Sequence, residues 1–171
     1  MSGRVAAEPR AEIAALWEAV RDGTITSIGS DHAPHTIEEK SLGLASAPAG
    51  VSGVQTLGAV LVDAMLEGRL ARERLAWLAS EGTARLYGLY PRKGALRAGS
   101  DADFTLVDPA GSTLVEAERL YSKQGYSPWE GQQLRGAVKT TVLRGNVIAR
   151  DGVPLGEPTG RLVRANHGAA R

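Results

Sequence analysis

The first half of the chain alternates helical and extended hydrophobic patterns. Residues 9–22 carry apolar side chains at positions i, i+3, i+4 and i+7, which predicts a helix. Residues 24–29 are short, β-branched and bounded by turn residues, which predicts a strand. Helical spacing returns over residues 55–67 and again over 71–87. A strand followed by helices predicts a parallel βα unit, and such a unit needs neighbouring strands that this sequence does not supply.

The second half has a different texture, with short alternating segments. Residues 103–108 and 138–144 have the alternation and β-branched content of strands. Gly145-Asn146 is a two-residue turn signal, so residues 147–150 are expected to pair back as a hairpin arm. Residues 156–171 are rich in Gly, Pro and Ala, which predicts a loosely held tail.

Composition narrows the possible partners and metal ligands. The formal net charge is +1 and no basic run is present, so nothing in the sequence favours nucleic acid. There is no cysteine, which leaves histidine and carboxylate as metal ligands. Residues 1–5 lack the apolar core of a secretory signal, and no stretch reaches the ~20 apolar residues of a membrane helix. We therefore expect a soluble, cytoplasmic protein that binds no membrane.

The segment with the most evident chemistry follows the predicted strand 24–29. Asp31, His32 and His35 place a carboxylate and two imidazoles close together at the strand's end, with Pro34 restraining the turn. A carboxylate there could bind a cation and take a proton from bound water, as in metal-assisted hydrolysis. Spacing alone favours the simpler interpretation of a hydrogen-bonded turn with solvated rings, because His-x-x-His is too common to define a metal site.

A family resemblance makes the hydrolytic interpretation stronger. The string Asp31-His32-Ala33-Pro34-His35-Thr36, followed by Glu38-Glu39-Lys40, resembles the signature of dihydroorotases, whose superfamily of cyclic amidohydrolases includes allantoinases and hydantoinases. The resemblance covers roughly residues 9–160. Further stretches that resemble family segments are 47–53, 84–94, 99–104, 127–131 and 138–152.

The resemblance implies a fold and a division of the chain. It implies an α/β chain that forms the terminal βα segment of a metal-dependent hydrolase (β/α)8 (TIM) barrel, plus C-terminal strands of the small composite β-sandwich domain. Residues 1–90 would belong to the barrel, 91–155 would form the β-sandwich strands, and 156–171 would be the tail.

The resemblance also implies roles for individual residues. Asp31 would ligate a divalent metal, expected to be zinc, and would act as general base and then general acid. His35 would contact a substrate carboxylate, and the backbone of Ala49 and Gly50 would contact the substrate. His32 is expected to orient the turn rather than to bind metal.

Most of the family's metal site has no counterpart in this sequence. The chain has three histidines and no His-x-His pair, and His167 falls in the tail. Catalytic zinc usually has three protein ligands, so we expect the isolated chain to be inactive. We also expect it to be poorly stable alone, and either to oligomerise or to need the missing N-terminal portion. The apolar stripes that would lack cover are Ile13, Leu16 and Trp17, and Leu57, Val60 and Leu61.

Two classes of function follow. The first is hydrolysis of a cyclic amide or ureide C–N bond by the full-length parent. Its Asp-His-Ala-Pro-His-Thr string favours a dihydroorotase-like parent. The alternative is an allantoinase or hydantoinase, because residues 142–161 resemble those enzymes more. The second is a non-catalytic, amidohydrolase-like assembly subunit. Elsewhere, Asp101 and Asp103 are expected to serve a turn rather than a metal, Lys40 to be a surface or loop-anchoring residue, and the basic residues along 85–97 to form a solvated face.

Overall fold

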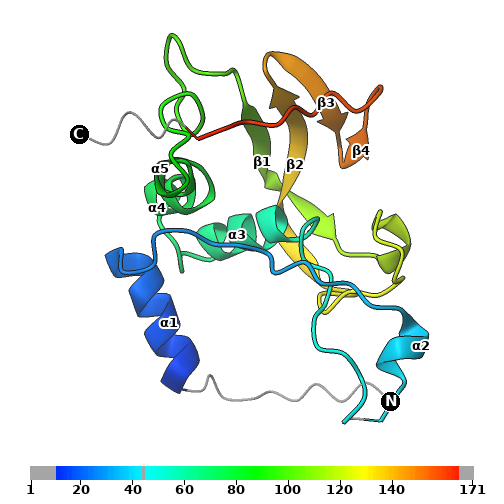
Figure 1. Cartoon of the computed structure of the whole chain (residues 1–171). Helices are drawn as coiled ribbons and strands as arrows, with labels where there is room; N and C mark the ends of the chain where they lie inside the picture. Colours follow the sequence, from blue (N-terminus) through cyan, green and yellow to red (C-terminus); the bar gives the residue numbers. More distant parts are fainter. Residues whose placement is uncertain (1–10, 44, 166–171) are drawn as a thin grey trace.

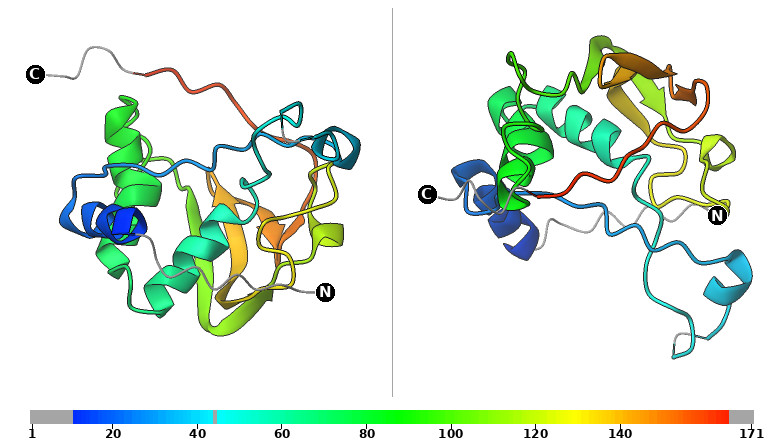
Figure 2. Two further views of the ribbon diagram at one scale, coloured as in Figure 1. Left: turned by 90° about the horizontal axis from the view of Figure 1, so that it is seen from below. Right: turned by 45° about the horizontal axis from the view of Figure 1, so that its top comes forward.

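The computed structural model describes residues 11–43 and 45–165 of the chain. Helices α1, α4 and α5 lie on one side and the sheet lies on the other (Figure 1). Helix α3 lies between these helices and the sheet. The segment around α2 projects away from this body (Figure 2, right). The elements are α1 Ala11–Asp22, α2 Ile37–Lys40, α3 Leu57–Leu66, α4 Arg72–Ala76, the π-helical η1 Trp77–Glu81, α5 Gly82–Leu86, β1 Phe104–Leu114, the 3-10 turn η2 Ala117–Arg119, β2 Gln133–Leu143, β3 Asn146–Arg150 and β4 Val153–Pro154.

The main apolar cluster lies where α1, α3 and the helical segment 72–86 meet. Its buried members are Val20, Leu61, Leu70 and Leu78. Burying a side chain of this size contributes about 1.5–3 kcal/mol relative to leaving it in water. Helix α1 is held here by Arg74, whose Nε donates to the Val20 carbonyl oxygen at 2.6 Å. The cluster therefore joins segments far apart in the sequence.

The predicted exposure of the two apolar stripes is correct for one stripe and wrong for the other. In α1, Ile13 is 46% exposed and Leu16 is 59% exposed, although Trp17 packs against the cluster. In α3, by contrast, Leu61 is buried and Leu57 is partly buried against the same cluster. The α3 stripe finds cover within this chain because the helical segment that follows folds back onto it.

The predicted strand 24–29 is wrong as an element. These residues form no ladder, and the only nearby pairing in the described chain is an isolated parallel bridge between His32 and Val51. A strand is defined by hydrogen bonds to a neighbour, and β-branched residues alone cannot provide that neighbour. The segment runs across the front of α3 as an irregular connection (Figure 1).

The helix predicted over 71–87 is confirmed, with a π-helical turn in its middle. Segments α4, η1 and α5 follow one another directly. The wider turn lies beside Gly82, where an added Cβ would overlap the Trp77 indole and come within 2.6 Å of the Thr26 carbonyl oxygen. Absence of a side chain at Gly82 thus allows the helix to approach the irregular segment.

The strands form one antiparallel sheet in the order β1-β2-β3-β4. The hairpin predicted between β2 and β3 is confirmed, but its turn residues are Arg144 and Gly145, not Gly145 and Asn146. Arg144 has φ 47° and Gly145 has φ 80°, the double positive φ of the turn that matches strand twist. Asn146 instead begins β3 and pairs with Leu143.

Helix α3 covers the edge of β2 that β3 leaves free. Gly136 of β2 allows the approach, because an added Cβ would lie 2.6 Å from Val62 and 2.9 Å from Leu66. The Asp63 carboxylate accepts the backbone N–H of Arg135 at 2.8 Å, which replaces a missing ladder bond. Hydrogen bonding to Arg135 also lowers the pKa of Glu67. An open edge would otherwise invite pairing with another chain.

An ion-pair network lies in the connection between α5 and β1 and reaches the β2–β3 turn. The Lys93 ammonium contacts the carboxylates of Asp101, at 2.9 Å, and Asp103. Asp103 also accepts the backbone N–H of Arg144 at 2.7 Å. The turn role predicted for the two aspartates is confirmed for Asp103, whereas the Asp101 carboxylate forms ion pairs with Arg92 and Lys93. The predicted solvated face over 85–97 is wrong for Lys93, whose side chain is only 17% exposed.

Candidate functional site

The Asp31 turn has an uncommon backbone conformation. Asp31 is exposed and has φ 44°, in the left-handed region that non-glycine residues rarely adopt. It ends the irregular segment that runs across α3, and the pairing with Val51 begins at the next residue. Strained residues of this kind persist only where their surroundings hold them, and they gather at functional sites.

A second loop, residues 48–55, packs directly against this turn. The Ala33 N–H donates to the Val51 carbonyl oxygen at 3.0 Å. Gly50, at φ 108°, makes the close approach possible, since a Cβ there would lie 2.7 Å from both the Cβ and the carbonyl oxygen of Ala33. Gly53 does the same at Ser30, where the distance to the carbonyl oxygen would be 2.8 Å.

His32 supports the turn through its ring. The backbone N–H groups of Gly53 and Val54 donate to His32 Nδ1 at 3.2 and 3.5 Å. An Nδ1 that accepts hydrogen bonds carries no proton, which places the ring's proton on Nε2. The structure therefore agrees with an orienting role for His32. Its Nδ1 lone pair is used by the two backbone N–H groups and is not free to bind a metal.

His35 and Lys40 lie around α2. Thr36 caps this short helix in a capping box with Glu39. The same Glu39 carboxylate lies 3.4 Å from His35 Nδ1, and the His35 side chain is 31% exposed. Lys40 Nζ donates to the Pro48 carbonyl oxygen at 2.7 Å, so its predicted loop-anchoring role is confirmed. Pro48 adjoins Ala49, which is exposed, and this bond thus fixes the start of the second loop.

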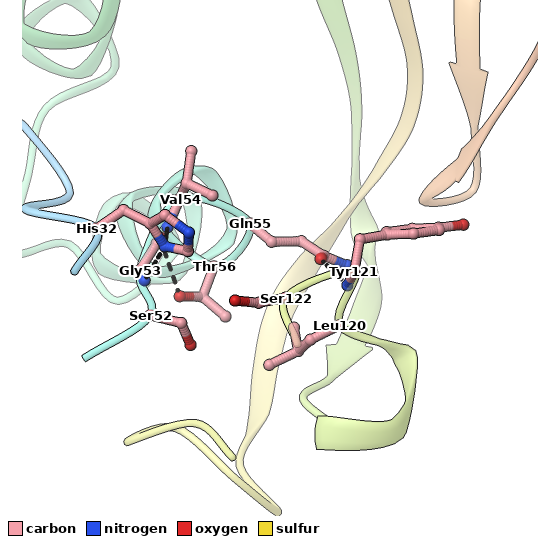
Figure 3. Close-up of a pocket in the computed structure, with 9 residues that line it drawn as sticks. All are labelled: His32, Ser52, Gly53, Val54, Gln55, Thr56, Leu120, Tyr121 and Ser122. Atoms are coloured by element: carbon pink, nitrogen blue, oxygen red, sulfur yellow. Dashed lines mark hydrogen bonds between the residues drawn. The ribbon is translucent and has the colours of Figure 1, made fainter. Parts of the chain in front are cut away.

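The second loop is in turn attached to the connection between β1 and β2, a contact the sequence did not reveal. Gln55 Nε2 donates to the Arg119 carbonyl oxygen at 3.0 Å, and Gln55 Oε1 accepts the Tyr121 N–H at 2.9 Å. Buried Ser52 donates to the Tyr126 carbonyl oxygen at 3.3 Å. Figure 3 shows Ser52, Gln55 and Tyr121 among the residues that line a cavity of about 150 Å³, together with the His32 ring.

The described residues do not make a metal centre by themselves. No group of three His, Asp or Glu side chains that could hold a metal occurs within residues 11–43 and 45–165. Asp31 stands without a second ligand, and the nearby His32 uses Nδ1 for backbone contacts. His167 lies outside the described residues. The chemistry that these residues offer is one exposed carboxylate on a braced turn.

The matches to known proteins define the class. The model of the amidohydrolase family matches residues 7–148, and the chain belongs to this family. An L-hydantoinase from Paenarthrobacter aurescens is 40% identical over 83% of this chain, and an allantoinase from Rubrobacter xylanophilus is 39% identical over 91%. A dihydroorotase from Methanothermobacter thermautotrophicus is 37% identical over 84%. The chain spans 32%, 35% and 33% of these three relatives, about a third of their length.

Solved structures confirm the predicted fold class. An L-hydantoinase from Arthrobacter aurescens matches 86% of this chain and 34% of its own, with 39% identity and a TM-score of 0.80. A D-hydantoinase matches 86% and 33%, with 31% identity and a TM-score of 0.79. The chain therefore has the fold of one segment of these hydantoinases, which have the TIM-barrel amidohydrolase fold. No helix in the described part of the chain is long and apolar enough to cross a membrane.

Proposed function

We propose that this chain contributes the proton-transferring carboxylate to the active site of a cyclic amidohydrolase, which cleaves the C–N bond of a cyclic amide or ureide. The observation that carries the proposal is the exposed Asp31 carboxylate on a backbone held at φ 44° by two loops. The named relatives act on rings of this kind, and the Asp31–Thr36 string favours a dihydroorotase-like substrate.

Each proposed role uses an atom of this chain. Asp31 accepts a proton from the water that attacks the ring carbonyl carbon, and a tetrahedral intermediate forms. The same carboxyl then gives the proton to the ring nitrogen as the C–N bond breaks. His35 faces a carboxylate of the substrate, and the backbone of Ala49 and Gly50 holds the ring. A divalent metal, expected to be zinc, would supply Lewis acidity, but Asp31 is the one ligand we assign to it here.

Two alternatives concern the same site. The identities of 40%, 39% and 37% to a hydantoinase, an allantoinase and a dihydroorotase do not separate the three substrates. A non-catalytic subunit is favoured by a different observation, that residues 11–43 and 45–165 hold no complete metal-ligand set. In that case Asp31 would be a structural residue of the turn.

The first experiment separates these possibilities. The pure chain is assayed with dihydroorotate, allantoin and hydantoin, with and without zinc, and its metal content is measured. We expect no stoichiometric metal and no turnover. The chain is then co-expressed with the portion of the Paenarthrobacter aurescens L-hydantoinase that this chain does not match, expected from the resemblance to be its N-terminal part, and the assays are repeated with the complex.

The decisive variant in the complex is Asp31→Asn. Asparagine tolerates positive φ, so the turn keeps its shape while the proton acceptor is lost. We expect turnover to fall by about 10²–10⁴-fold, the usual contribution of acid–base catalysis. The matched control is Asp151→Asn, since Asp151 is also exposed and has φ 48° but lies in the β3–β4 turn. Equal activity in the two variants would contradict the role of Asp31, and a stable complex without turnover would favour the non-catalytic alternative.

A further inference from the structure

The positive φ of Asp31 requires support from outside the turn. A left-handed conformation is strained for a residue other than glycine, so it relaxes unless neighbouring contacts stabilise it. The adjoining contacts come from the second loop, through the Ala33–Val51 hydrogen bond and the His32 ring. Loops held by so few bonds move unless they are themselves fixed.

The second loop is fixed at the sheet. Gln55 makes two hydrogen bonds to backbone atoms of the β1–β2 connection, residues 115–132, and it bridges two points of that connection, Arg119 and Tyr121. Ser52 and Thr56, on either side of the loop's end, are 5% and 6% exposed. The loop is thus attached to the sheet's connection through buried Ser52 and exposed Gln55, whereas its other end, at Ala49, is exposed and has no such bond to the connection among the described residues.

The connection itself is anchored to the sheet at its base. The Val115 N–H donates to the Gln132 carbonyl oxygen at 3.0 Å, and the Gly131 N–H donates to the Val115 carbonyl oxygen at 2.9 Å. These two bonds close the connection directly beyond the ends of β1 and β2. The sheet is therefore linked to the Asp31 turn by the Gln55 hydrogen bonds, the backbone of residues 53–55 and the hydrogen bonds to His32, which lie around the cavity in Figure 3.

We infer that the β1–β2 connection is a positioning device for Asp31, acting through Gln55 and His32. The sheet then does more than pack against α3, because it fixes the backbone of the residue that carries the proposed chemistry. The catalytic part of this inference rests on the proposed function, while the positioning of the Asp31 backbone can be tested without any activity.

The test uses nuclear magnetic resonance on the full chain and the variant Gln55→Met, which keeps the side chain's length and removes both hydrogen bonds. Two signals are followed: the Asp31 Cα shift and HN–Hα coupling, which report positive φ, and the exchange rate of the Ala33 N–H. We expect the Asp31 signals to move toward negative φ and the Ala33 amide to exchange about tenfold faster, the effect of losing one to two net hydrogen bonds. Gln55→Glu, which keeps the acceptor for Tyr121, should show an intermediate effect.

The matched control is Asn146→Leu, which removes a 3.2 Å hydrogen bond from Asn146 Nδ2 to the Arg144 carbonyl oxygen at the β2–β3 hairpin, the end of β2 opposite the connection. It should leave both signals unchanged. Asp31 signals that are the same in Gln55→Met and in the unchanged chain would overturn the inference. If the chain oligomerises, hydrogen exchange read by mass spectrometry on peptides covering residues 26–35 replaces the magnetic resonance measurement. A uniform increase in exchange over all peptides would show general destabilisation and would also overturn the inference.

The proposed function and this inference fail in different ways. If Asp31→Asn retains full turnover in the complex while Gln55→Met still shifts the Asp31 signals, the positioning stands and the catalytic role falls. If Asp31→Asn abolishes turnover but Gln55→Met leaves the Asp31 signals unchanged, the catalytic role stands and the positioning role is refuted.

Discussion

Gly50→Ala tests the contact between the two loops of the candidate site. Gly50 has φ 108°, and a Cβ at this position would lie 2.7 Å from the Cβ and the carbonyl oxygen of Ala33. Neither of these atoms belongs to a flexible side chain, so the backbone of one loop must move. The Ala33–Val51 hydrogen bond lies next to the collision and is the first interaction at risk.

The expected cost has two parts. An alanine forced to positive φ costs about 1–2 kcal/mol. Overpacking against rigid neighbours adds about 1–3 kcal/mol. We therefore expect Gly50→Ala to cost about 2–5 kcal/mol, a large share of the 5–15 kcal/mol that typically stabilises a domain. If the loop detaches instead of unfolding with the body, the same cost appears locally as faster exchange of the Ala33 amide.

Two glycine controls separate the two parts. Gly23 has φ 100° and nothing within 4 Å of an added Cβ, so Gly23→Ala measures the backbone cost alone. Gly58, in the first turn of α3, also has open space and no positive φ, so Gly58→Ala should stabilise by about 0.5–1 kcal/mol. The assay is urea unfolding followed by circular dichroism, with amide exchange at Ala33. A Gly50→Ala cost no greater than that of Gly23→Ala would refute the predicted collision and the close packing of the loops.

Further tests address the rest of the fold. Gly82→Ala should destabilise the chain by about 1–3 kcal/mol in urea unfolding, because the new Cβ overlaps the Trp77 indole. Glycine normally weakens a helix, so a gain in stability would contradict the packing of the π-helical turn. Hydrogen bonding from Lys93 lowers the pKa of Asp101 below its ordinary value of 3.8, so this carboxylate's contribution to stability is complete above that pH and is lost as the pH falls through the lowered value. Lys93→Met should flatten this acid limb in pH-dependent melting, and an unchanged acid limb would show that the pair does not stabilise the fold.

Local patterns were sufficient for several features of this fold. The helical repeat of residues 9–22, 55–67 and 71–87 is visible in the sequence because every turn of an amphipathic helix repeats the same apolar face. The hairpin after β2 is visible because Gly145 marks a tight turn between two segments with strand composition, although the turn itself begins one residue earlier than predicted, at Arg144. Asp31 and His32 were identified from their string of neighbours, and Gly50 from the loop that follows.

Other features depended on partners distant in the sequence. Residues 24–29 have the composition of a strand, yet a parallel strand exists only beside neighbours that hydrogen-bond to it. Lys93 lies in a basic stretch typical of a solvated face, but its ammonium group pairs with Asp101 and Asp103 and its side chain is only 17% exposed. The pairing of Gln55 with Arg119 and Tyr121 has no local signal, because a glutamine near a helix start is ordinarily exposed.

The sequence by itself determined the amidohydrolase class, the helices and hairpin, and the carboxylate on which the proposed chemistry depends, because these follow from repeats and strings of adjacent residues. Only the tertiary structure decided that the Asp31 backbone is held at positive φ, that Gly50 and Ala33 touch, and that the sheet's connection supports both loops. These are contacts between segments up to 74 residues apart, as between Ser52 and Tyr126, and hydrogen bonds of that span leave no periodic trace in the chain.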